Sequence, residues 1–145
     1  MDTLNTQPGN PSCRSCPLHK IEGCLTTLIA WLTVVTGTAQ ILIPQKMLPL
    51  LSVAPDAAPA HLFATVGMFM VLFGGSVIHA QRYAQQNPSV LTVVLLWAFL
   101  QKLGASLFVA WGISKGVFAP LAGIVASFDF LSAILFFDYR RRSAS

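Results

Sequence analysis

Charged residues are scarce in this sequence: Asp, Glu, Lys and Arg together make up 10% of its 145 residues. Ordinary soluble chains carry roughly 25% charged residues. Hydrophobic residues reach 54%, and the mean hydropathy is +0.67. This composition excludes a soluble domain, a disordered chain, a collagen and a coiled coil, because each needs a polar, periodic or charge-rich sequence. The solvent that suits such a chain is lipid.

Acidic residues are fewer still, since five Asp and Glu stand against nine Lys and Arg for a net charge of +4. No basic run interleaved with aromatic residues occurs, so we expect no nucleic-acid partner. The one basic cluster, Arg140, Arg141 and Arg142, directly follows an apolar segment. There it can meet anionic lipid headgroups, and the partner that the charges indicate is the bilayer.

Cysteine occurs only three times, at Cys13, Cys16 and Cys24, which excludes a framework of paired disulfides. With His19 these cysteines supply four soft ligands, the number that a tetrahedral zinc site needs. The spacing is nonstandard, and it is not the c-type haem pattern, which has His directly after the second Cys. Three interpretations stay open: a zinc or other metal site, a redox-active or lipid-modified cysteine pair, and an inert tail.

Four apolar segments follow, each close to the ~20 residues that cross a ~30 Å hydrocarbon layer as a helix. They predict an all-α, polytopic membrane protein with a four-transmembrane-helix bundle. A cleavable signal peptide is the alternative for the first segment, but its apolar run is longer than a typical signal core. We expect a flexible, cysteine-containing cytoplasmic tail at 1–20, a transmembrane domain at 21–139 with spans at 23–43, 58–80, 90–113 and 118–137, and a basic tail at 140–145.

The connections between the spans differ in kind. Only residues 114–117 separate the third and fourth spans, so these helices must be antiparallel neighbours, with Pro120 in the opening turn of the fourth. Four spans place both termini on one face, which then carries six Lys and Arg against two on the other. The positive-inside rule therefore predicts cytoplasmic termini, in a bacterial inner membrane.

Lys102 is the residue that packing alone explains least, because a charge near the middle of a span costs ~2.5–3.5 kcal/mol. Asp129 lies at similar depth in the next span, and the short hairpin brings the two into register. Small residues share the faces of both and let the helices approach. Two interpretations stay open for the pair: an ion pair that sets helix register, and a proton or ligand site. The small residues are Ala98, Ala105 and Ser106 beside Lys102, and Ala122, Ala126 and Ala133 beside Asp129.

Further polar residues are candidates for lining the bundle interior. Gln40 and Gln101 can add hydrogen bonds, and Thr26, Thr33 and Gly37 share one helical stripe with Gln40. Threonines in membrane helices usually bond their own backbone, which is the structural alternative. In the second span, Gly67, Gly74 and Gly75 are explained as helix-packing contacts. His61 and His79 lie at opposite ends of this span, where we expect interfacial residues, and they are too far apart to bind a haem together.

No nucleophile elbow, paired-carboxylate site, zinc-protease helix or nucleotide-binding turn occurs in the sequence. We therefore expect no enzyme and, apart from zinc on the tail, no cofactor. The classes that remain are an accessory or scaffold component of a larger membrane complex or homo-oligomer, and a small transporter or ligand-binding bundle, with proton-linked transport included.

Residues 25–140 resemble the small four-helix bacterial membrane proteins of the broad DoxX-like group, in particular its uncharacterised members. The matching features are short: Gln101-Lys102-Leu103-Gly104 in the third span, then Phe128-Asp129-Phe130 and Phe136-Phe137 in the fourth. The resemblance implies a four-helix bundle and no particular activity.

Overall fold

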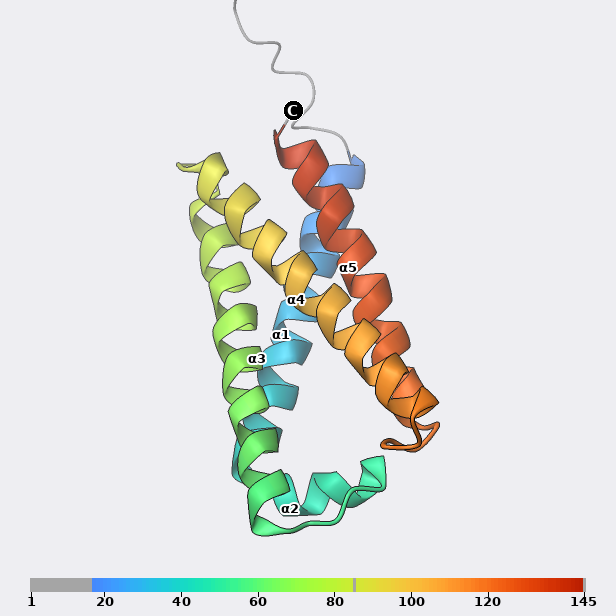
Figure 1. The fold of residues 1–145 in the computed structure, drawn as a ribbon. Helices are drawn as coiled ribbons and strands as arrows, with labels where there is room; N and C mark the ends of the chain where they lie inside the picture. Colours follow the sequence, from blue (N-terminus) through green and yellow to red (C-terminus); the bar gives the residue numbers. More distant parts are fainter. Residues whose placement is uncertain (1–16, 85, 145) are drawn as a thin grey trace, which may run out of the picture.

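The computed structural model describes residues 17–84 and 86–144, and it is all-α over those ranges (Figure 1). Four of its helices are long and apolar enough to cross a membrane, which confirms the predicted class of multi-pass helical bundle. Two short helical turns connect the first two spans. In chain order the elements are α1 (Pro17–Leu42), α2 (Pro44–Met47), the 3-10 helix η2 (Leu48–Leu51), α3 (Ala57–Tyr83), α4 (Pro88–Ser114) and α5 (Ala122–Ala144).

The first and last long helices extend beyond the boundaries that the sequence predicts. Helix α1 already begins at Pro17, so residues 17–20 are helical and do not belong to a flexible tail. Helix α5 continues to Ala144, so residues 140–144 extend the last span and do not form a separate basic tail. Hydropathy marks where a helix leaves the hydrocarbon, whereas backbone hydrogen bonding continues into the polar interface.

The connection between α4 and α5 is longer than the predicted four residues. Gly116 has a φ of +71°, the left-handed conformation that glycine adopts readily after a helix C-terminus. Pro120 lies before α5, in successive turns in which Ala122 N–H donates to Ala119 O and Gly123 N–H donates to Pro120 O. The loop therefore spans residues 115–121, and the antiparallel arrangement of the two helices is as expected.

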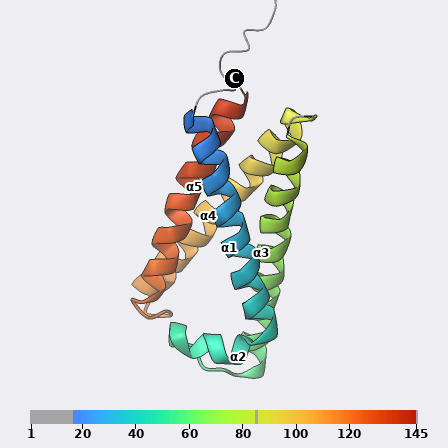
Figure 2. The same cartoon turned by 180° about the vertical axis from the view of Figure 1, so that it is seen from behind.

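The long helices form two pairs, α1 with α3 and α4 with α5, as Figures 1 and 2 show from opposite sides. The pairs converge at the end that holds the start of α1 and the end of α5. They diverge toward the other end, where α2 and η2 run across from one pair to the other. There Ala119 N–H of the last loop donates to Leu51 O of η2 at 3.3 Å. The apolar core lies nearer the converging end and contains Ala30, Val77, Ala80, Leu91, Leu95, Ala98, Phe136 and Tyr139.

Glycines set the distance between α1 and α3. A Cβ on Gly67 would lie 2.6 Å from Gly37 O, and one on Gly74 would lie 2.8 Å from Ala30 O. Both positions therefore require glycine, as predicted, because the two backbones touch. Gly75 does not belong to this contact: a Cβ there would meet nothing within 4 Å. The prediction for Gly75 is wrong because it lies one residue, or 100° of helix rotation, away from the seam.

We expect Gly74→Ala to destabilise the bundle by about 1–3 kcal/mol, because the added methyl overpacks the α1–α3 contact. Gly75→Ala is the matched control, and it should cause no loss. The unfolding free energy of each variant in mixed micelles measures the effect. A Gly74→Ala variant as stable as the parent would show that α1 and α3 do not pack through their glycines.

Candidate functional site: a buried ion pair

Lys102 of α4 and Asp129 of α5 form an ion pair inside the bundle. The distance from Lys102 Nζ to Asp129 Oδ1 is 2.6 Å, and the two side chains are 3% and 11% exposed. The contact follows from the antiparallel hairpin, which brings positions 102 and 129 to the same depth. Ala98, Ser106 and Ala126 are buried around the pair and give it room between closely packed helices.

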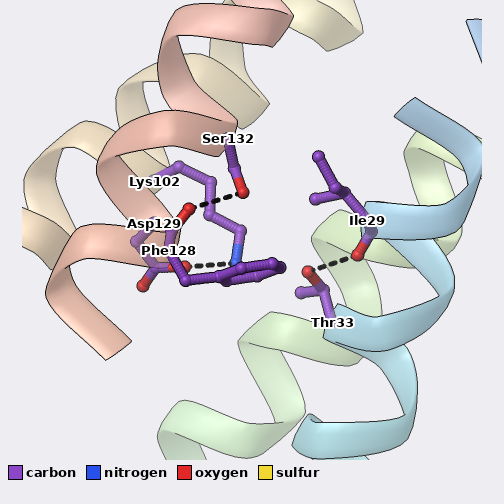
Figure 3. Close-up of polar contacts among 6 residues, drawn as sticks. All are labelled: Ile29, Thr33, Lys102, Phe128, Asp129 and Ser132. Carbon is purple, nitrogen blue, oxygen red and sulfur yellow. Dashed lines mark hydrogen bonds and ion pairs between the residues drawn. The ribbon is translucent and has the colours of Figure 1, made fainter. Parts of the chain in front are cut away.

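The lysine ammonium has more hydrogen-bonding capacity than its neighbours use. An ammonium has three N–H donors, and within the described residues Nζ makes one hydrogen bond, to Asp129 Oδ1. Nζ lies 5.5 Å from the centre of the Phe128 ring, which adds a cation–π contact from below (Figure 3). Ser132 supplies no bond to the pair, since its hydroxyl donates to Phe128 O at 2.7 Å.

A small cavity of about 10 Å³ adjoins Lys102 at the point where all four long helices meet. Its polar lining is Thr33, Gln101 and Lys102, and the rest is apolar. A cavity of this size has room for about one water molecule at most. Thr33 of α1 lies across from Lys102 in the bundle interior (Figure 3).

The predicted polar stripe on α1 is buried in the structure. Thr26, Thr33, Gly37 and Gln40 all face the interior. Thr33 donates to Ile29 O at 2.8 Å, the backbone bond expected of a membrane threonine. Thr26 Oγ1 and Gln40 Oε1 are buried without a hydrogen-bond partner. Of the predicted lining residues, the structure brings Thr33 and Gln101 to the Lys102 cavity, whereas Gln40 does not line it.

The predicted metal ligands lie largely outside the described residues, which exclude Cys13 and Cys16. His19 and Cys24 both belong to α1. Cys24 is exposed and free. Within residues 17–84 and 86–144, no three His, Cys, Asp or Glu side chains lie close enough to hold a metal. The zinc site on Cys13, Cys16, His19 and Cys24 stays a prediction.

The two histidines of α3 lie at its opposite ends, as predicted, and both are exposed. His79 packs against Tyr83 with ring centres 4.8 Å apart. His61 borders a surface hollow of about 450 Å³ together with Lys46 and Gln45. Neither histidine reaches the interior, so neither contributes to the ion-pair site.

A second buried polar group was missed by the sequence analysis. Glu22 of α1 is buried and pairs with Arg142 of α5, with Arg142 Nε 3.2 Å from Glu22 Oε1. Gln81 of α3 donates from Nε2 to Gly23 O at 3.2 Å, and its side chain also hydrogen-bonds Tyr139. The sequence carries one signal for this group: Glu22 is an isolated acidic residue directly before the first apolar run.

Comparison with family models, with curated proteins and with solved structures gave no match to this chain. The site is therefore interpreted from its own geometry, and the resemblance to the DoxX-like group stays a prediction.

We expect Thr33→Val to destabilise the protein by about 0.5–1.5 kcal/mol more than Thr38→Val. The two threonines make the same bond to the carbonyl four residues earlier, each at 2.8 Å, so its loss cancels in the comparison. They differ in surroundings, since Thr33 lines the Lys102 cavity and Thr38 is exposed. Unfolding of both variants in micelles decides the matter. Equal losses would mean that the Thr33 hydroxyl serves only its own helix.

Proposed function

We propose that this protein is an accessory or scaffold component of a membrane assembly, not an enzyme, in which the Lys102–Asp129 pair fixes how α4 and α5 pack. The observation that carries the proposal is the way the pair is enclosed. The side chains are 3% and 11% exposed, small residues surround them, and the adjoining cavity has room for about one water. A pair enclosed in this way suits a role in fixing the register of α4 against α5 better than a role in binding a substrate.

The partner in this proposal is a larger membrane complex or a second copy of the chain, in addition to the lipid bilayer. Large apolar side chains cover the outer faces of all four long helices, among them Leu28, Phe69, Phe108 and Ile134. Such faces suit lipid and neighbouring membrane helices equally. On the resemblance alone, we place the protein in the DoxX-like group. A zinc ion held by Cys13, Cys16, His19 and Cys24 is also part of the proposal.

A small transporter or ligand-binding bundle, proton-linked or not, is the second candidate. The observation that favours it is the unused hydrogen-bonding capacity of the interior. Lys102 uses one of its three donors on Asp129, and Thr26 Oγ1 and Gln40 Oε1 on α1 are buried without a partner. Buried polar atoms in this state cost free energy and can mark a functional site.

Both proposed functions require that Lys102 and Asp129 pair, and replacing one or both of them tests this contact. Lys102→Met or Asp129→Leu alone leaves an unpaired charge inside the bundle, which typically costs ~3–5 kcal/mol, whereas the double variant should recover much of that loss. Folded yield and unfolding free energy of the four proteins measure the coupling. A Lys102→Met variant as stable as the parent would contradict the pairing itself.

The cellular phenotype of the same double variant decides between the functions. Under the scaffold proposal, both folded yield and cellular phenotype return in Lys102→Met/Asp129→Leu, because a packed apolar pair preserves the register. Under the transport proposal, yield returns and the phenotype stays lost. Copurification of a partner with the parent and with the double variant, but not with Gly74→Ala, is the independent check on the scaffold role.

We further propose that the protein lies in a bacterial inner membrane with both termini in the cytoplasm. The support is the charge split: six Lys and Arg lie on the side of the termini, and Lys46 and Lys115 lie on the other. In the structure, the start of α1 and the end of α5 lie at the same end of the bundle (Figure 1).

Fusion of alkaline phosphatase after Ser145 should give an inactive enzyme, because the reporter folds only outside the cytoplasm. A fusion within the loop between α1 and α3, such as after Ser52, should give an active one and serves as the control. High phosphatase activity at Ser145 would reverse the proposed orientation.

A further inference from the structure

The second buried polar group lies where the two helix pairs converge, at the end that carries the start of α1 and the end of α5 (Figure 2). We call it the terminal cluster. Its members come from three helices and join both pairs: Glu22 and Thr27 on α1, Gln81 on α3, and Asp138, Tyr139 and Arg142 on α5.

The two partners of the ion pair in this cluster differ in burial. The Glu22 side chain is 8% exposed, whereas that of Arg142 is 46% exposed. Arg142 is also shared, because its Nη2 lies 3.0 Å from Asp138 Oδ2 one turn earlier on α5. A buried carboxylate thus depends on an exposed guanidinium that has a second acidic partner. Breaking this pair would leave the Glu22 charge in the protein interior.

The second oxygen of the same carboxylate is not satisfied. Among the residues that the structure describes, none donates a hydrogen bond to Glu22 Oε2, which is buried. A carboxylate oxygen in this state gains hydration when it becomes exposed to water. Separating α1 from α5 at this end would therefore lose the Glu22–Arg142 contact and gain water on Oε2. These two terms oppose each other, so separating the helices costs less than the loss of the ion pair alone.

The rest of the contact between the pairs is of a different kind. Below the terminal cluster lies an apolar layer that includes Ala30, Leu95 and Phe136. At the far end, where the pairs diverge, the backbone bond from Ala119 to Leu51 links the last loop to η2. Apolar surfaces can slide or reseat, whereas the Glu22–Arg142 pair has to break before α1 and α5 can part.

From this geometry we propose that the Glu22–Arg142 ion pair is a latch between the two helix pairs. Closed, it holds α1–α3 against α4–α5 at the terminal end. Open, it lets α4–α5 move away at that end and gives water access to Glu22. The latch is independent of the role assigned to Lys102 and Asp129, since it lies on the other side of the apolar layer.

Distances between spin labels in lipid nanodiscs test the latch. The natural Cys24 on α1 is exposed and serves as one label site, with Cys13 and Cys16 replaced by Ser. Val90 on α4, which is 48% exposed, becomes the second through Val90→Cys. This distance joins the two pairs at the converging end. A second distance, from Cys24 to Arg82→Cys on α3, stays within one pair and reports whether the fold is intact.

We expect Arg142→Gln and Glu22→Gln to lengthen and broaden the Cys24–Val90 distance while the Cys24–Arg82 distance keeps its parent value. Asp138→Asn is the control: it removes the charge that shares Arg142, whose Nε donates to Asp138 Oδ2 at 3.1 Å, but it keeps both Glu22 and Arg142, so it should leave both distances unchanged. Should Glu22→Gln fail to fold, Arg142→Gln decides, because that side chain is half exposed and its loss leaves the interior packing in place.

Two results would overturn the latch. One is a parent-like Cys24–Val90 distribution in folded Arg142→Gln, which would mean that the apolar layer and the Gln81–Tyr139 hydrogen bond hold the pairs together without the Glu22–Arg142 pair. The other is an equal lengthening in Asp138→Asn and Arg142→Gln, which would trace the effect to the end of α5 and not to the contact with α1.

Discussion

A lysine charge within a bilayer needs a counter-charge at close range, and this requirement organises α4, α5 and the centre of the bundle. Lys102 and Asp129 can meet at 2.6 Å only if the two helices run antiparallel at one depth and lie close together. Small residues around the pair allow that approach. The Phe128 ring and the Lys102 cavity then follow from where the ammonium lies, and all four long helices contribute to its surroundings.

The two helix pairs use different physical means to achieve close packing. Helices α4 and α5 approach through alanine and serine and bury one ion pair, whereas α1 and α3 approach through Gly37, Gly67 and Gly74 with their backbones in contact. Hydrophobic burial cannot distinguish one helix arrangement from another in lipid, because the lipid tails are as apolar as the side chains. The buried ion pair and the backbone contacts at glycine therefore determine how the helices are arranged.

Along the bundle axis, an apolar layer lies between two polar groups. The terminal cluster lies at the converging end, with Arg142 half exposed. The apolar layer follows, and the Lys102–Asp129 pair lies beyond it along α4 and α5. A scaffold needs such a layered interior for rigidity, and a transporter needs an apolar barrier between two polar sites. The two candidate functions thus share one architecture and differ in whether the layers move.

Sequence alone determined the fold class, the four spans and the contact between Lys102 and Asp129, because hydropathy, length and a short connection are local properties. Helical periodicity also placed Thr33 in the bundle interior, but it did not distinguish Gln101, which lines the Lys102 cavity, from Gln40, which does not. Only the tertiary structure decided which glycines touch, since Gly74 and Gly75 differ by one position on the helix and not by composition. The same holds for Glu22 and Arg142: they are 120 residues apart in sequence, and their meeting depends on how α1 and α5 converge, which no local pattern specifies.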